Sequence, residues 1–144
     1  MSTTNEKNIA TILHLSALTQ YIFPIVIWSS KKEDSAFINS NGKNVLNFQL
    51  SIFIYSVVLG LIAIPIFIYT LLKNISSDIS FHNHDFIINH FDFRSIDGIA
   101  IIGIIALLLF CFLKITEFIL IIHAAVKVSN GEEYKYPLSI PFIK

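Results

Sequence analysis

The sequence has little charge and almost no cysteine. Asp, Glu, Lys and Arg together make up 14% of the 144 residues, and ten basic residues balance ten acidic ones. Because the chain has no net charge, it has no basic field to attract a polyanion, and we predict no nucleic-acid partner. The single cysteine, Cys111, lies inside a hydrophobic run, which excludes an internal disulfide and a thiolate metal cluster. We interpret it as a small buried apolar residue.

Hydrophobic residues are what the sequence has in excess. They form 54% of the chain, and the mean hydropathy is +0.69. A water-soluble globule of this size leaves much of its surface wet, so it cannot bury that amount of apolar side chain. The composition therefore predicts a single integral membrane domain over residues 1–144, with the lipid bilayer as its first partner.

Three hydrophobic stretches are long enough to cross a bilayer, whose hydrocarbon core of about 30 Å requires about 20 helical residues. They cover residues 9–28, 45–72 and 99–126. Trp28 closes the first stretch at a position suited to the headgroup region. Pro65 predicts tilt or a kink in the second. The expected fold class is an all-α membrane protein with three transmembrane helices and an extended C-terminal tail.

The distribution of Lys and Arg predicts an orientation in a cytoplasmic membrane. With three spans, Lys7, Lys73 and Arg94 would lie on one side. The opposite side would hold Lys31, Lys32, Lys43, Lys127, Lys135 and Lys144. The positive-inside rule then places the N-terminus outside and the C-terminus inside. It also makes residues 73–98 an extracytoplasmic loop and residues 129–144 a cytoplasmic, interfacial tail.

Two ionisable residues, Lys114 and Glu117, fall near the middle of the third stretch. Their spacing places them on one helix face, within reach of each other. Each costs about 2.5 to 3.5 kcal/mol at a helix centre, which the many apolar neighbours offset. The pair fits either a self-neutralised structural contact, which we favour, or part of an ion or proton path.

Further polar residues lie in the first two stretches. Asn44, Asn47, Ser51 and Tyr55 share one stripe at helical spacing, and Gln49 lies on a different face. His14 lies in the first stretch, where we expect an interior hydrogen bond rather than a metal ligand. Such residues usually join helices through hydrogen bonds worth about 0.6 to 2 kcal/mol each.

No catalytic constellation, cofactor motif or metal template is recognisable. Gly42-Lys43 lacks the upstream glycine and the following Ser or Thr of a phosphate-binding loop. His82, His84 and His90 follow no ligand template, and the phenylalanines between them favour a segment on the membrane surface. We therefore predict neither an enzyme nor a bound cofactor or metal.

The last residues alternate between apolar and polar side chains. From Tyr134 to Phe142 the period is two, and two prolines interrupt any helix. The pattern predicts an extended segment. It can anchor the third span at the headgroups, clasp the inner loop, or add as a strand to a partner.

Three motifs carry a resemblance to a known family. They are HLSAL at 14–18 with FPIVIW at 23–28, GKNVLNFQ at 42–49, and NGEEYKYPL at 130–138. In order and spacing they resemble a family of small, uncharacterised bacterial membrane proteins grouped with the channel-like subunit of the chloroplast inner-envelope (Tic) import translocon. Asn44 and Glu133 depart from its usual pattern. The resemblance implies a three-span helical protein without an established reaction.

These observations lead to two hypotheses about function. The first is an interaction, assembly or accessory component of a membrane complex, formed with further copies of the chain or with another membrane protein. The second is a small channel or transporter that uses Lys114, Glu117, Asn47 and Gln49 to line a path.

Overall fold

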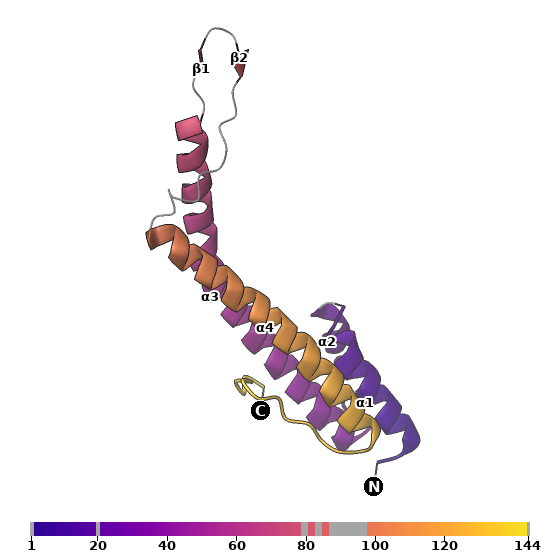
Figure 1. Ribbon diagram of the computed structural model, residues 1–144. Helices are drawn as coiled ribbons and strands as arrows, with labels where there is room; N and C mark the ends of the chain where they lie inside the picture. The colour runs from indigo at the N-terminus through magenta and orange to yellow at the C-terminus, as the bar shows by residue number, and fades with distance from the viewer. Residues whose placement is uncertain (1, 20, 79–80, 83–84, 87–97, 144) are drawn as a thin grey trace. The chain divides into compact units, whose positions relative to one another are not determined.

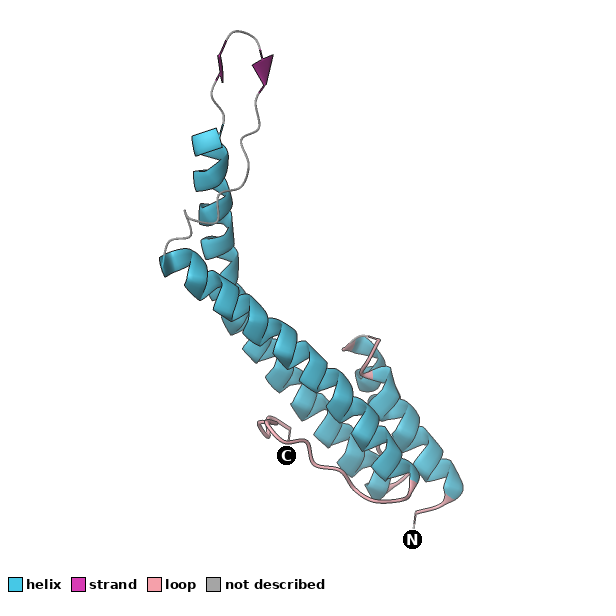
Figure 2. Ribbon diagram, in the orientation of Figure 1, coloured by secondary structure: helices cyan, strands magenta, loops and turns pink. Residues whose placement is uncertain are grey.

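The computed structural model describes residues 2–19, 21–78, 81–82, 85–86 and 98–143 (Figure 1). Within these ranges the chain is helical apart from short connections, the tail and two strands of two residues each (Figure 2). The elements are α1 Thr4–Ser16, α2 Ile22–Lys31, α3 Ala36–Asp78, β1 Phe81–His82, β2 Asp85–Phe86 and α4 Gly98–Ser129. The two strands pair antiparallel, with Phe81 opposite Phe86.

The chain divides into two compact units, which we describe separately. The first contains residues 1–55 and 113–144, and the second contains residues 56–112. Each of the long helices α3 and α4 contributes one part to each unit.

The first predicted span is not one helix. A capping box formed by Thr3 and Glu6 starts α1, which ends at Ser16. The hydroxyl of Ser16 donates to the Leu13 carbonyl at 2.8 Å, and that of Thr19 donates to the Ser16 carbonyl at 2.7 Å. These side-chain bonds compete with the helical ladder, and the chain turns here.

Pro24 marks the start of a separate helix after this turn. It is the third residue of α2, where a backbone N–H has no intrahelical partner, so the missing donor costs nothing. With 13 and 10 residues, α1 and α2 are about 20 Å and 15 Å long, too short to cross a bilayer. The prediction of a span over residues 9–28 is therefore wrong.

Two helices are long and apolar enough to cross a membrane. Among the described residues these stretches are Ala36–Lys73 in α3 and Ile101–Ser129 in α4. They contain most of the second and third predicted spans. The structure thus confirms the all-helical fold, with two helices suited to a membrane instead of three. Pro65 lies inside α3, and the chain is helical on both sides of it.

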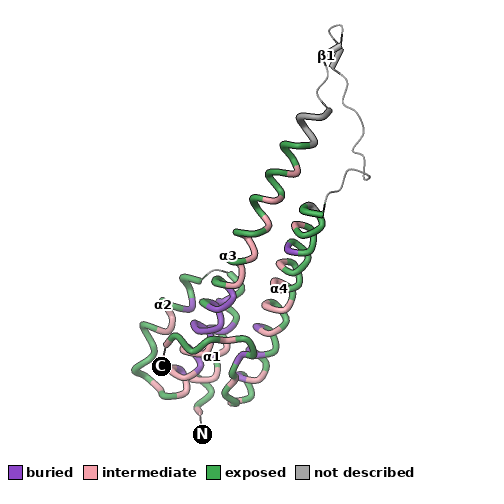
Figure 3. The backbone as a smooth tube through the Cα atoms, turned by 90° about the vertical axis from the view of Figure 1, so that its left-hand side faces the viewer, coloured by how far each residue is buried: buried purple, intermediate pink, exposed green. Residues whose placement is uncertain are grey.

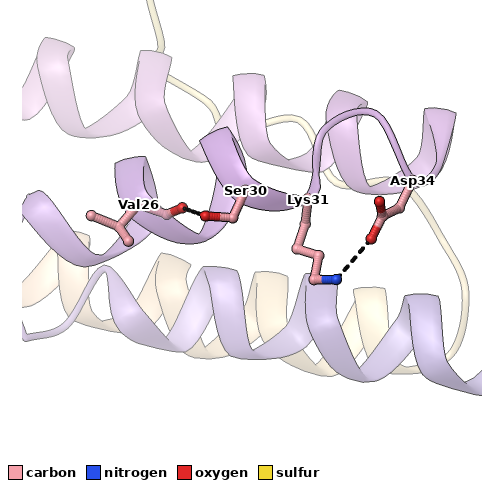
Figure 4. A network of polar contacts seen from close by, with 4 residues as sticks. All are labelled: Val26, Ser30, Lys31 and Asp34. Atoms are coloured by element: carbon pink, nitrogen blue, oxygen red, sulfur yellow. Dashed lines mark hydrogen bonds and ion pairs between the residues drawn. The ribbon is translucent and has the colours of Figure 1, made fainter.

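A tight turn reverses the chain between α2 and α3. Figure 4 shows its two sides, where Ser30 donates to the Val26 carbonyl at 2.9 Å and Lys31 pairs with Asp34 at 2.9 Å. Beyond the turn, α2 and α3 run antiparallel. The Trp28 indole donates to the Asn39 side chain, while the ring of Tyr21 meets that of Phe53 edge-on at 5.9 Å.

The core of the first unit lies between α1, the beginning of α3, the end of α4 and the tail. Figure 3 shows the buried positions gathered in these segments. The apolar cluster consists of Leu13, Ala17, Val45, Phe48, Ile52, Ile121, Ala124 and Tyr136. Five polar side chains are also buried in this unit, namely His14, Asn41, Asn47, Gln49 and Ser51.

The second unit is built from the apolar parts of α3 and α4. The two helices approach closely at Gly103, where an added Cβ would lie 2.6 Å from Cγ2 of Ile66. Large side chains such as Leu61, Phe67 and Leu108 point outward from the unit, each well exposed. An apolar exterior of this kind is stable against lipid and unfavourable against water.

Candidate functional site

A chain of hydrogen bonds joins α1, α3 and the tail through His14, which is fully buried. Its Nδ1 lies 2.7 Å from the Tyr136 hydroxyl, and its Nε2 lies 3.2 Å from Oδ1 of Asn41. The Asn41 amide nitrogen donates to the Phe37 carbonyl at 2.9 Å, which leaves Oδ1 as an acceptor. His14 therefore carries its proton on Nε2, and Tyr136 donates to Nδ1.

Burial keeps this network neutral. Desolvation lowers the pKa of His14 from 6.5 to about 4, although the bond to Asn41 acts in the opposite direction. Desolvation also raises the pKa of Tyr136 well above its usual range. The Tyr136 ring stacks on Phe48 with centroids 4.0 Å apart. The network is a structural connection that suits the neutral imidazole.

The predicted stripe on α3 binds the C-terminal tail. Asn47 donates from Nδ2 to the Ile143 carbonyl at 3.0 Å and accepts from the Ile143 N–H at 2.7 Å. Ser51 accepts from the Ile140 N–H at 2.8 Å, and the Tyr55 hydroxyl donates to the Leu138 carbonyl at 3.1 Å. Three of the four residues of the stripe thus bind main-chain groups of the tail, whereas Nδ2 of the fourth, Asn44, has no partner among the described residues.

Gln49 lies on another face of α3, as its position in the sequence predicts. Its amide nitrogen donates to the Ala17 carbonyl at 3.3 Å, next to the turn between α1 and α2. The side chain is buried, and its Oε1 has no hydrogen-bond partner in the described part of the chain. Gln49 stabilises the turn by donating to a carbonyl that the end of α1 leaves without a helical partner.

Lys114 and Glu117 form an ion pair beside the same turn. Nζ of Lys114 lies 2.8 Å from Oε2 of Glu117, and the two side chains are 39% and 13% exposed. The pair lines a hollow of about 350 Å³. The other lining residues are Ala17, Leu18, Thr19, Tyr21, Phe118 and Ile121.

The structure separates the intramembrane polar candidates into four sets. Asn47, Ser51 and Tyr55 bind the tail, and His14 belongs to the buried network. Gln49 binds the Ala17 carbonyl, and Lys114 with Glu117 lines the hollow. Asn47 and Gln49 are thus not among the residues that line the hollow with the ion pair. The structure does not gather the channel candidates in one place.

Sequence reasoning did not single out Asn41 and Asn39, which bind His14 and Trp28. Both lie before residue 45, where the predicted second span begins, so no pattern connected them with a buried partner. The loop histidines that were considered as metal ligands fall mainly outside the described residues. Within the described residues no group of His, Cys, Asp and Glu has the arrangement of a metal site.

Residues near the two ends of the chain lie together. A Cβ at Gly131 would lie 3.0 Å from Nζ of Lys7 and 3.2 Å from the hydroxyl of Ser2. The predicted placement of the termini on opposite sides of the membrane required an odd number of spans. Two spans remove that basis.

Comparison with known proteins provides one match. Neither the curated proteins nor the solved structures contain a match to this chain. The sequence profile of the magnetosome magnetite crystal formation protein family matches residues 5–143, which include parts of both units and the tail. This finding supports a small membrane-protein family and does not support the grouping with the import translocon. The chain belongs to the magnetosome magnetite crystal formation protein family.

Proposed function

We propose that this chain is an accessory structural protein of a membrane at which magnetite crystals form. The family match indicates the process, which is magnetite crystal formation. The contacts within the first unit indicate a structural role in that process. The observation that carries the structural role is the use of Asn47, Ser51 and Tyr55 to bind the tail. Polar groups that would otherwise line a path are engaged in holding the protein's own fold.

A rigid unit joined to an apolar exterior is suited to assembly in a membrane. The buried network and the tail fix the first unit, while the outward apolar side chains of the second favour lipid or other transmembrane helices. Helix association in lipid depends on close packing and interhelical hydrogen bonds. The partner in this proposal is a second copy or another membrane protein.

Both ends of the chain belong on the cytoplasmic side in this proposal. Two spans return the chain to the side where it started. That side then holds seven of the ten Lys and Arg residues, which are Lys7, Lys31, Lys32, Lys43, Lys127, Lys135 and Lys144. The opposite side holds only Lys73, near the end of α3, and Arg94. This distribution satisfies the positive-inside rule.

Cysteine labelling in intact cells tests the orientation. In a Cys111→Ser background, Ser77→Cys should react with a membrane-impermeant maleimide from outside. Ser2→Cys and Lys135→Cys should react only after the membrane is opened. Labelling of Ser2→Cys in intact cells would restore the arrangement with an external N-terminus.

Deletion and co-purification test the function. In a host that forms magnetite, removal of the chain should change the number or size of the crystals, and its return should restore them. The tagged chain, solubilised in mild detergent, should elute as an oligomer or with a reproducible membrane partner. Unchanged crystals together with a monomeric, unaccompanied chain would refute the proposal.

The hollow beside Lys114 and Glu117 favours one alternative function, a small channel or transporter. Its test is the double variant Lys114→Leu with Glu117→Leu, in which both charges are removed together so that neither remains unpaired. Reconstituted protein would be assayed for ion and proton flux beside oligomer size. Flux that disappears while assembly survives supports transport, and assembly that is lost supports the structural role.

A further inference from the structure

We propose that residues 137–143 form a re-entrant segment inside the membrane, held by the polar stripe of α3 on one side and covered by lipid acyl chains on the other. This inference does not depend on the proposed function, because it concerns the depth of the tail and not a partner. It assigns lipid contact to a segment that the sequence places at the headgroup level.

Residues 137–143 run a short way along α3 and then turn back, and we call this segment the excursion. Leu138 is next to Tyr55, whereas the later residues Ile140 and Ile143 are next to Ser51 and Asn47. The tail thus reaches Tyr55 and then returns toward the beginning of α3. Leu138 has a φ of 66°, the left-handed conformation that reverses a chain in a tight turn.

Part of the main chain of this excursion is bound within the protein. Pro137 and Pro141 have no N–H to satisfy. Of the five remaining N–H groups of residues 137–143, three are bound: those of Ile140 and Ile143 donate to Ser51 and Asn47, and that of Phe142 donates to the Ile140 carbonyl at 3.0 Å. An unpaired main-chain group in hydrocarbon costs several kcal/mol, so these bonds lower the cost of placing non-helical chain there.

The outward face of the excursion is apolar. Leu138, Ile140 and Phe142 are 60%, 41% and 45% exposed. Side chains of α3 in the same stretch, such as Leu50 and Phe53, are also exposed. Polar groups therefore face α3 while apolar groups face outward, which is the arrangement that lipid favours and water opposes.

The position of the stripe along α3 supports this depth. Between Lys43 and Lys73 the helix contains no charged residue, and this whole stretch belongs to the segment that is apolar enough to span. Asn47, Ser51 and Tyr55 follow Lys43 within about three helical turns. A tail that binds these residues therefore lies beyond Lys43, on the side of the uncharged stretch of α3.

Accessibility of single cysteines measures the depth of the tail. The full chain with Cys111→Ser is reconstituted into vesicles of phosphatidylcholine and phosphatidylglycerol, with a cysteine at Leu138 or, as the control, at Lys135. An impermeant maleimide should label Lys135→Cys and should not label Leu138→Cys until detergent is added. A bimane at position 138 should be quenched by lipids brominated on their acyl chains. Labelling of Leu138→Cys as fast as Lys135→Cys would overturn the proposal.

A second set of variants tests whether the stripe holds the tail in place. Asn47→Leu removes both bonds to Ile143, so Leu138→Cys should become labelled in intact vesicles. Asn44→Leu makes the same change on α3 at a side chain whose Nδ2 has no partner among the described residues, and it should leave the labelling unchanged. Ser51→Ala is the milder variant if Asn47→Leu does not fold, as judged by elution from a sizing column. Protection that survives every folded variant would show that the stripe does not hold the tail.

Discussion

The two units of this protein solve the problem of polar main-chain and side-chain groups in opposite ways. In the described helical part of the second unit few such groups need other partners, because α3 and α4 carry mainly apolar side chains there and bond their own main chains. The first unit contains a broken helix and an extended tail, and it provides buried polar side chains for them. Irregular chain requires specific hydrogen-bond partners, whereas a regular helix in a membrane requires only apolar length.

The largest expected difference in stability between the two units comes from a decrease in pH. His14 has a folded pKa of about 4 against 6.5 in the unfolded chain, so protonation favours the unfolded state. The stability is fully present above pH 6.5 and is lost as the pH falls through about 4. The loss amounts to about 3 kcal/mol and belongs to the first unit only. Tyr136 and Asn41, which face His14, remain uncharged in this range.

Thermal unfolding in detergent between pH 7 and pH 4 measures this effect, with the midpoint decreasing as acid is added. His14→Asn should remove most of the dependence, and the control His123→Gln should retain it. A midpoint that does not change with pH in the unaltered chain would contradict a neutral buried imidazole.

Glycine substitutions compare the packing of the two units directly. A Cβ at Gly42 would lie 2.0 Å from Cδ1 of Trp28, so Gly42→Ala should destabilise the first unit by about 1 to 3 kcal/mol. At Gly60 the nearest side-chain atom is 3.8 Å away, on Ile64. Gly60→Ala should stabilise α3 by about 0.5 to 1 kcal/mol, since alanine is the better helix former.

Unfolding midpoints of these two variants, measured side by side, should therefore move in opposite directions. Trp28 fluorescence should change only in Gly42→Ala. Equal shifts in both variants would mean that the two units are not packed differently.

Removal of one hydroxyl sharpens the description of the network. Tyr136→Phe keeps the stacking on Phe48 but leaves Nδ1 of His14 without its donor. The expected cost is about 1 kcal/mol, together with a smaller penalty for protonating His14. The acid-induced shift of the midpoint should decrease in this variant. A pH profile identical to that of the unaltered chain would show that the hydroxyl does not contribute to the neutral state.

The smallest effect is expected at the turn between α2 and α3. Lys31 and Asp34 are about half exposed, so Lys31→Met should change stability by less than about 0.5 kcal/mol. Chemical denaturation at low and high salt should agree with this small value. A change of several kcal/mol would indicate that the turn controls folding of the first unit.

Sequence patterns identified a substantial part of the candidate site. The stripe of Asn47, Ser51 and Tyr55 follows from helical spacing, and the three-residue separation of Lys114 and Glu117 placed them within reach of each other. The extended tail followed from alternation and proline. All of these features depend on residues that are near one another in the chain, so local geometry was enough to find them.

These local patterns did not predict which of the features would contact one another. Asn47 and Ile143 are 96 positions apart, and His14 and Tyr136 are 122 positions apart. The stripe was interpreted as a contact between helices or as a path, because periodicity does not say which segment covers a face. The break between α1 and α2 was missed because hydropathy averages over Ser16, Thr19 and Pro24, whose effects are local and directional.

The hydropathy of the sequence was enough to predict a membrane protein and to find the two segments, in α3 and α4, that are long enough to cross a bilayer. Apolar length alone controls that outcome, because a helix satisfies its own main chain. Only the tertiary structure decided that the first stretch becomes two short helices and that the tail returns along α3. Those outcomes depend on hydrogen bonds between distant residues, whose partners are chosen when the chain packs.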